Sequence, residues 1–394
     1  MTTQRQTRIP ALYMRGGTSK GVFFLPDDLP TDPARRDAVL LRVIGSPDPY
    51  EKQIDGMGGA ASSTSKVVII GKSDRPDCDV DYLFGQVAID RPLVDWSGNC
   101  GNLTAAVGPF AIHRGLVQAP RDGVARVTIW QANIGKKIVA HVPMRDGQVQ
   151  ELGDFVLDGV TFPAAEIRLE FLDPGADAGE DGGAGGSATF PTGKRIDELD
   201  VPGVGKLRAT LINAGNPGVF LAAADLGLAG TEAPAELARD AALLARLEAI
   251  RAHAAVAMGL AESAEYATSH RQHTPKLAYF AAAAPYVASS GKAVGAEDID
   301  LLARIISMGK PHHAMTGTGA VGIAAAAAIP GTIVSEVLGG TRDTVCFGHP
   351  SGVLRVGAEA REEGGNWIVT KVSMSRSARR LMEGHVYVPQ KLLD

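Results

Sequence analysis

Two stretches of small residues lead into almost uncharged helical segments, and this repeated pattern constrains the fold most. Residues 97–102 precede an Ala- and Val-containing segment that ends near Gly115, and residues 315–319 precede an Ala-rich segment that ends at residues 330–331. A helix without charged residues is buried on all sides, and its N-terminus offers free N–H groups and a positive dipole end to an anion. The pattern therefore predicts two buried helices, the first kinked or shortened by Pro109.

Other segments carry ordinary helix and strand signals. Asp32 can cap a helix that starts at Pro33 and ends at Gly45. Apolar spacing predicts a long helix over residues 237–254 and another over residues 299–309, where a glycine ends the pattern. Runs of β-branched or aromatic residues predict strands at 22–25, 67–70, 127–130, 138–142 and 219–221.

The length and the order of these elements indicate a two-domain α+β protein. The 394 residues suffice for two cores. The Gly- and Asp-rich stretch 173–186 reads as a linker, so we expect one domain over residues 1–190 and a second over 191–385. Strands and helices mix without regular βαβ alternation, which favours α+β over a doubly wound sheet.

Charge and composition exclude several classes of protein. A net charge of −5 without a long basic stripe argues against nucleic-acid binding. The polar residues 1–10 predict no secretory signal, and no apolar run is long enough to span a membrane. Three cysteines, an odd number, favour the reducing cytoplasm over a disulfide scaffold. No spacing suits zinc, and the adjacent His312 and His313 are expected to point apart.

Cys100 is the first candidate for chemistry. It lies at a predicted helix start, where the dipole and free N–H groups favour a thiolate. A small buried cysteine in a tight turn is the alternative interpretation. For Cys78 and Cys346, the structural interpretation is preferred, because the first lies among charged residues and the second in a strand-like run.

Three short motifs resemble the diaminopimelate epimerase superfamily. Residues 97–102 resemble its Asn-Cys-Gly-Asn signature, and residues 315–320 resemble its Cys-Gly-Thr-Gly-Ala signature with Thr316 in place of the second cysteine. Residues 213–218 resemble the Gly-Asn-Pro element that opens its second domain. Because epimerases of that type use two facing thiols, Thr316 argues against amino-acid epimerisation.

A more specific resemblance, to the 2-methylaconitate cis-trans isomerase (PrpF) family, covers almost the whole chain. Its motifs lie at residues 13–24, 44–50, 55–59, 62–66, 95–102, 271–276, 308–314, 348–352 and 374–379. The resemblance implies two similar domains, each a curled mixed β-sheet around a buried helix, with the active site in the cleft between them. It also implies that the tail 386–394 returns to the first domain.

The family resemblance assigns Lys66 and Cys100 as the acid/base pair. Without it, Lys66 would read as a lysine at the end of a strand. The chemistry is coherent, because burial or nearby cations can lower a lysine pKa enough for a neutral amine to accept a carbon-bound proton.

A delocalised carboxylate-bearing anion needs hydrogen-bond donors. For residues 17–19 the alternative interpretation is a plain tight turn, and for residues 63–65 it is a run of hydroxyls at a sheet edge. For Arg271 it is a solvated surface arginine. His312 could equally be structural. The candidate substrate-binding residues are Gly17, Thr18, Ser19, Ser63, Thr64, Ser65, Asn99, Gly101, Asn102, Arg271, Lys310, Met315, Thr316, Gly317, Thr318 and Ser351.

The expected activity is isomerisation of an unsaturated tricarboxylate by proton abstraction and return, without cofactor or metal. 2-Methylaconitate, in the methylcitrate route of propionate breakdown, is the favoured substrate, and 4-oxalomesaconate or aconitate is the alternative. A protein that binds a tricarboxylate for an aconitase-like dehydratase is the non-catalytic alternative. The expected partner is a small polycarboxylate, with no nucleic acid or membrane, and a homodimer is the candidate assembly.

Overall fold

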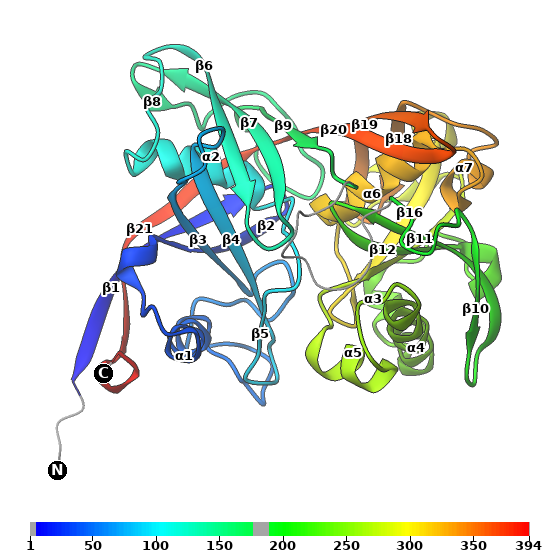
Figure 1. Cartoon of the computed structure of the whole chain (residues 1–394), viewed down its shortest axis with the longest axis horizontal. Helices are drawn as coiled ribbons and strands as arrows, with labels where there is room; N and C mark the ends of the chain where they lie inside the picture. The colour runs from blue at the N-terminus through cyan, green and yellow to red at the C-terminus, as the bar shows by residue number, and fades with distance from the viewer. Residues whose placement is uncertain (1–4, 176–188, 394) are drawn as a thin grey trace.

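The computed structural model describes residues 5–175 and 189–393. The chain forms two lobes of α+β structure, each a curled mixed sheet around a buried helix (Figure 1). Most of the predicted linker, from residue 176 to 186, lies outside the described residues. The domain boundary at residue 190 stays a prediction.

The first lobe contains most of the elements before residue 175. Its strands are β1 (Gln6–Gly16), β2 (Ser19–Phe24), β3 (Lys66–Lys72), β4 (Val80–Val87), β5 (Val94–Asp95), β6 (Gly123–Gln131), β7 (Lys136–Arg145), β8 (Gln148–Val149) and β9 (Ile167–Leu172). Its helices are α1 (Pro33–Ile44) and α2 (Thr104–His113).

The second lobe contains most of the elements after residue 197. Its strands are β10 (Asp197–Val201), β11 (Gly205–Ala214), β12 (Asn216–Ala222), β13 (Lys276–Ala282), β14 (Tyr286–Val287), β15 (Ala293–Val294), β16 (Leu301–Ser307), β17 (Lys310–Pro311), β18 (Thr344–His349), β19 (Gly352–Glu363) and β20 (Asn366–Arg376). The last strand, β21 (Ala378–Pro389), pairs with β1 of the first lobe. Its helices are α3 (Pro234–Leu237), α4 (Ala241–Ala257), α5 (Ala264–His270), α6 (Gly317–Ala328) and α7 (Ile333–Val337).

The two lobes repeat the same strand pairing. In the first, β1–β2, β3–β4 and β6–β7 pair antiparallel, whereas β2–β3 and β4–β6 pair parallel. In the second, β11–β12, β13–β16 and β18–β19 pair antiparallel, whereas β12–β13 and β16–β18 pair parallel. Strand β3 therefore corresponds to β13, and β4 corresponds to β16.

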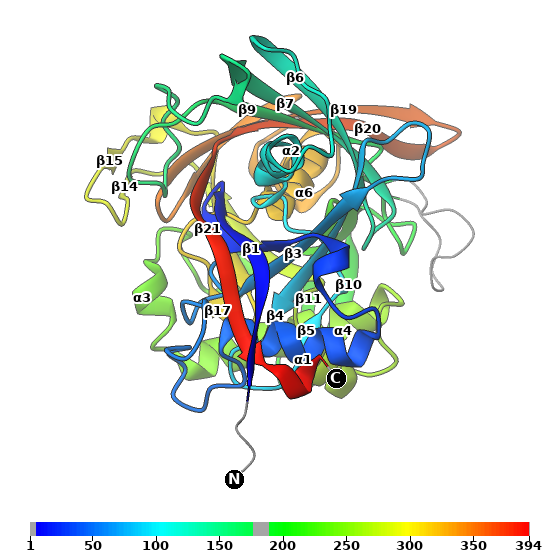
Figure 2. The same cartoon turned by 90° about the vertical axis from the view of Figure 1, so that its left-hand side faces the viewer.

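The uncharged segments form the buried helices α2 and α6, as predicted. Every residue of α6 is buried, and α2 is buried from Thr104 to Ala111. Figure 2 shows both helices near the middle of the molecule, surrounded by strands. Pro109 lies inside α2 and does not end it, since the helix continues to His113.

The last strands join the two lobes. Strand β20 pairs with β9, and β21 pairs with β1 along residues 378–389 (Figure 2). Val386 thereby lies opposite Ile9, and Val388 opposite Thr7. The C-terminal strand is therefore part of the sheet that holds the first strand of the chain.

Several predicted elements are confirmed. Helix α1 begins at Pro33, the Asp32 carboxylate accepts a hydrogen bond from Arg35 N at 2.9 Å, and Gly45 ends the helix at a φ of 84°. The five predicted strands correspond to β2, β3, β6, β7 and β12.

Other expectations were wrong. Residues 299–309 contain strand β16, in which every residue is buried; an apolar run covered on both faces carries no period that separates strand from helix. The predicted long helix over residues 237–254 is instead α4 alone. The preceding helix α3 ends at Leu237, and α4 begins after Asp240, whose side chain accepts a hydrogen bond from Leu243 N. His312 and His313 do not point apart: their rings stack with centroids 4.7 Å apart.

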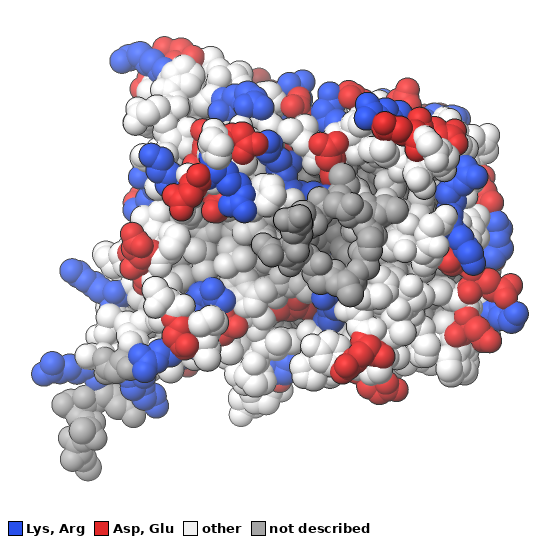
Figure 3. Space-filling view, in the orientation of Figure 1, with Lys and Arg blue, Asp and Glu red and all other residues white. Residues whose placement is uncertain are grey.

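Charged side chains surround the face shown in Figure 3, with acidic and basic residues interspersed along its edge. Within residues 5–175 and 189–393, no helix has the length and apolar character needed to cross a bilayer.

Candidate active site

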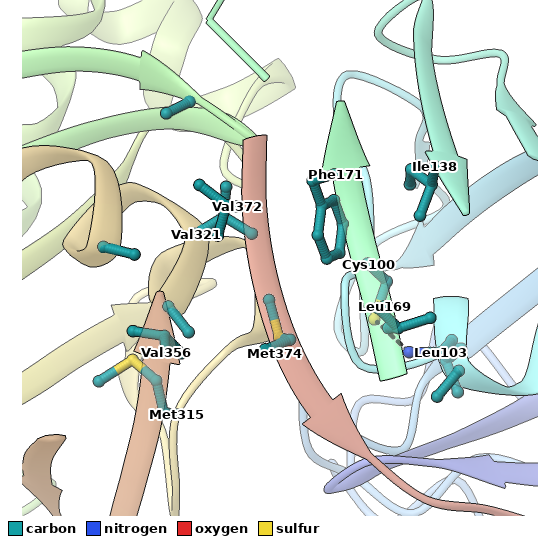
Figure 4. Packing of buried hydrophobic residues seen from close by; sticks show 14 of the residues in the cluster. Cys100, Leu103, Ile138, Leu169, Phe171, Met315, Val321, Val356, Val372 and Met374 are labelled. Carbon is teal, nitrogen blue, oxygen red and sulfur yellow. Dashed lines mark hydrogen bonds between the residues drawn. The ribbon is translucent and has the colours of Figure 1, made fainter. Parts of the chain in front are cut away.

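Cys100 lies in the turn that leads into α2. The helix itself begins at Thr104, about one turn after the predicted start at Cys100. Its Sγ accepts a hydrogen bond from Leu103 N at 3.5 Å, and its carbonyl accepts one from Tyr82 Oη at 3.2 Å. Figure 4 shows Cys100 in the buried cluster that also contains Leu169. Cys100 is buried, with 8% of the residue exposed.

The turns before α2 and α6 meet backbone to backbone. A Cβ added to Gly101 would lie 2.7 Å from the carbonyl carbon of Gly317, and one added to Gly317 would lie 2.4 Å from the carbonyl carbon of Gly101. Only glycine allows this approach. The predicted anion-binding helix starts, one from each lobe, are therefore brought together.

Asn102 ties the Gly17 loop to both lobes. Its Nδ2 donates to Thr18 Oγ1 at 3.0 Å and to the Met315 carbonyl at 3.2 Å, and its Oδ1 accepts from Arg376 Nε at 3.1 Å. Gly17 has a φ of 52°, and a Cβ there would lie 2.5 Å from Asn102 Oδ1. Three predicted binding segments thus meet at one amide side chain.

Lys66 is the first residue of β3 and is 5% exposed. Its Nζ donates to Gln86 Oε1 at 2.6 Å and lies 4.9 Å from the centre of the Phe84 ring. Burial lowers the pKa of the Lys66 ammonium, and the neighbouring Cys100 partly opposes this by raising it. A buried amine with a lowered pKa, held by a neutral amide and lying beside a thiol, is suited to accept a proton as a general base.

The unpaired side chain of Asn99 also indicates a ligand site. Its backbone is fully engaged, because Asn99 N donates to Asn216 Oδ1 at 2.8 Å and its carbonyl accepts from Asn216 Nδ2 at 3.0 Å. Its side-chain Nδ2 and Oδ1 are buried and have no partner. Since buried polar groups are rarely left unpaired, this amide is available to a ligand.

Residues 62–64, just before Lys66 in the chain, line two hollows. One, of about 220 Å³, lies between the lobes and is lined by Ser62, Gln86, Ser307 and Lys310 among others. The other, of about 570 Å³, is lined by five of the hydroxyl and glycine candidates. They are Gly17, Thr18, Ser19, Ser63 and Thr64.

Other predicted binding residues have structural partners. Ser65 Oγ donates to Gln53 Oε1 at 2.8 Å, and Ser351 Oγ donates to the His313 carbonyl at 2.5 Å. Lys310 forms an exposed ion pair with Glu51 at 2.6 Å. Their role in substrate binding stays a prediction.

Three further candidates differ in whether their polar atoms already have hydrogen-bond partners. Thr316 caps α6, accepting from Gly319 N at 3.1 Å, and Thr318 lies in its first turn. Arg271 has a buried Nε without a partner, so it keeps donor capacity.

Three histidines of the second lobe, His273, His312 and His349, are buried, and burial lowers the pKa of each. Burial, followed by the neighbouring His313, holds the pKa of His312 well below its usual range, and its Nδ1 accepts from Ala314 N at 3.1 Å. Within the part of the chain that the structure describes, no three His, Cys, Asp or Glu side chains are grouped to hold a metal.

The comparisons with known proteins agree with this geometry. A family model described as PrpF protein matches residues 6–389. The chain belongs to the PrpF family. A 2-methyl-aconitate isomerase of Shewanella oneidensis is 62% identical over 394 residues, which cover 98% of each chain.

Solved structures extend the PrpF comparison to the fold. A methylitaconate-delta-isomerase is 40% identical, with a TM-score of 0.74 and coverage of 99% of this chain and 97% of that one. A probable proline racemase from Agrobacterium radiobacter K84 is 13% identical over 97% of this chain and 94% of that one, with a TM-score of 0.55. The latter establishes only that the racemase-like and epimerase-like fold is shared.

Sequence reasoning missed several residues that the structure places around the candidate site. Lys276 and His273 belong to the motif at residues 271–276 but were not singled out, and the same holds for Asn216 and Arg376 in their motifs. A comparison of the two lobes would have found Lys276, since β3 and β13 both begin with lysine and share the same burial pattern. Gln86 carried no local signal.

Proposed function

We propose that this chain is a cofactor-independent isomerase that moves a proton on an unsaturated tricarboxylate. The favoured reaction is cis-trans isomerisation of 2-methylaconitate. The observation that carries the proposal is the buried Lys66 amine beside Cys100, next to the meeting point of the two helix starts. The relatives named as isomerases of similar acids support it.

The first step is a proton transfer to Lys66. In its neutral form the amine takes a proton from the carbon next to the conjugated system, and the C–H electron pair spreads over the alkene and its carboxylate. The lowered pKa of Lys66 supports this role, because a base must be unprotonated before it can act. Gln86 Oε1 holds the amine in place through the 2.6 Å hydrogen bond.

The second step returns a proton after rotation or an allylic shift. Either the Lys66 ammonium supplies it, or the Cys100 thiol does and the Lys66 ammonium then passes its proton to the Cys100 thiolate. In both cases the enzyme returns to its starting state, and the overall reaction neither gains nor loses atoms or electrons. A carbanion conjugated with a carboxylate needs no redox group, and fixed donors can stabilise it. The unpartnered Asn99 amide and the free Arg271 Nε are suited to this task.

The cellular setting follows from the substrate. With 2-methylaconitate, the enzyme would serve the methylcitrate cycle of propionate catabolism. Three free cysteines suit the reducing cytoplasm, where we place the protein. We propose a small polycarboxylate as its ligand and a homodimer as its assembly.

Turnover by the purified protein tests the proposal. Incubation with 2-methylaconitate in D₂O, followed by ¹H NMR, should reveal isomerisation and deuterium incorporation, and EDTA should leave the rate unchanged. Parallel reactions with 4-oxalomesaconate and aconitate rank the substrates. Binding without turnover of any of the three acids would instead support the accessory-protein alternative.

A further inference from the structure

The second lobe contains a buried lysine at the position that Lys66 occupies in the first. Lys276 begins β13 as Lys66 begins β3, and the burial patterns of the two strands are identical. Lys66 lies opposite Gln86 on the neighbouring strand and donates to it. Lys276 likewise donates to Ser307 Oγ, at 2.9 Å, on the neighbouring strand β16. The fold thus presents two equivalent amines, one from each lobe.

The partners of Lys276 are neutral. Besides Ser307, its Nζ lies 3.2 Å from His273 Nδ1, and His273 Nε2 lies 3.3 Å from the Asn99 carbonyl. Because that carbonyl can only accept, the histidine carries its proton on Nε2 and accepts at Nδ1 from the amine. No carboxylate forms an ion pair with Lys276 among the described residues, so the charged form of this buried amine would have no direct counter-charge.

Lys276 is also connected to the candidate substrate space. Ser307 lines the 220 Å³ hollow between the lobes together with Gln86, the partner of Lys66. His273 joins Lys276 to Asn99, whose side-chain amide is buried and unpaired. One hydrogen-bonded chain therefore runs from the amine to the residue preceding Cys100.

We propose that Lys276 is a carboxylate-binding residue of this site, and that it becomes protonated when the polycarboxylate enters. The proposal rests on the proposed function and deepens it by assigning the second amine. Lys66 then accepts the proton from carbon, while the Lys276 ammonium pairs with a carboxylate of the same substrate.

The surroundings of Lys276 make its charge sensitive to a ligand. Burial, then repulsion from Lys66, lowers the pKa of Lys276 to about 7. An anion that binds beside it favours the charged form and raises that pKa, so binding takes up a proton. The titratable or charged groups facing it from the packed elements are Lys66, Asp95, Cys100, Arg251, His273 and His312.

Proton uptake on binding tests the assignment. The probe is propane-1,2,3-tricarboxylate, which has no double bond to isomerise and whose carboxyl groups are ionised at pH 8. Calorimetric titrations of the wild type in two buffers of different ionisation enthalpy should give a Lys276 contribution of roughly one proton per site at pH 8. The apparent Kd should weaken by about tenfold per pH unit above pH 7.

Variants isolate this contribution. Lys276→Met and Lys276→Gln should each lose roughly one proton of uptake at pH 8 and flatten the pH dependence of Kd. Lys206→Met, at an exposed lysine paired with Glu198, is the matched control and should behave like the wild type. Thermal melting identifies the variants that fold, and either one is sufficient for the test.

The outcomes separate the two proposals. Undiminished proton uptake and an unchanged pH dependence of Kd in a folded Lys276 variant would overturn the assignment, even if the wild type isomerises 2-methylaconitate. A role for Lys276 in packing alone would alter melting but not proton uptake, and this result would also overturn it. If the wild type turns over no tricarboxylate, but the Lys276 variants lose the proton uptake that the wild type shows, the proposed function fails while the binding role stands.

Discussion

The two lobes share a framework but differ in chemistry at equivalent positions. Both carry a buried lysine at the start of the same strand, Lys66 in the first and Lys276 in the second. At the paired helix starts, the first lobe has the Cys100 thiol, whose Sγ accepts a hydrogen bond from Leu103 N, whereas the second has the Thr316 hydroxyl, which accepts one from Gly319 N and caps α6. The repeated fold determines where side chains from both lobes meet, and in the proposed reaction single residues determine which lobe supplies the acid/base chemistry.

Among substitutions at the two helix starts, removal of the Cys100 thiol should cause the largest loss of turnover. Cys100→Ala should fold normally yet lose turnover by roughly a hundred- to ten-thousand-fold, the usual range for a positioned acid or base. Cys346→Ala, at another buried thiol, is the matched control and should remain active. NMR assays of both variants check this.

Thiol labelling sharpens the same point. Burial raises the pKa of the Cys78 and Cys346 thiols, so iodoacetamide should modify Cys100 faster than either. Equal labelling of all three, together with an active Cys100→Ala enzyme, would remove the proposed role of Cys100.

Forcing the two turns apart should have an intermediate effect. A Cβ at Gly317 would lie 2.5 Å from Asn102 N, so Gly317→Ala must displace backbone. We expect a loss of about 1–3 kcal/mol in the free energy of unfolding and a fall in turnover. Gly384→Ala, where an added Cβ meets nothing within 4 Å, is the control. Denaturant titrations and turnover assays of both variants measure this; a wild-type-like Gly317→Ala enzyme would show that the turns need not touch.

Replacing the second-lobe cap should have the smallest effect. Thr316→Ala leaves Gly319 N without its acceptor and should cost about 1 kcal/mol of stability. Turnover should fall far less than in Cys100→Ala, since Thr316 carries no proton in the proposed reaction. Loss of activity comparable with that of Cys100→Ala would mean that both helix starts take part in the chemistry.

Much of the fold was predictable because local signals agreed with it. Asp32, Pro33 and Gly45 bounded α1, and the lack of charge in α2 and α6 indicated their burial. Strand β16 was misread because burial on both faces removes the alternation on which strand prediction depends.

The site was only partly predictable. Motif resemblance located Lys66 and Cys100, but Gln86 contacts Lys66 only through strand pairing between β3 and β4. The link from Lys276 through His273 to Asn99 depends on the packing of one lobe against the other, which no local pattern encodes.

Exchange of substrate hydrogen with solvent deuterium tests the central claim, that Lys66 is the base, most directly. Lys66→Met keeps an apolar stem of similar length but has no amine. Lys66→Arg keeps the positive charge, but its guanidinium stays protonated and cannot act as a base. NMR in D₂O, with binding of 2-methylaconitate measured in parallel, should find exchange in the wild type and none in either variant, with binding retained in Lys66→Met. Exchange at the wild-type rate in Lys66→Met would contradict the account.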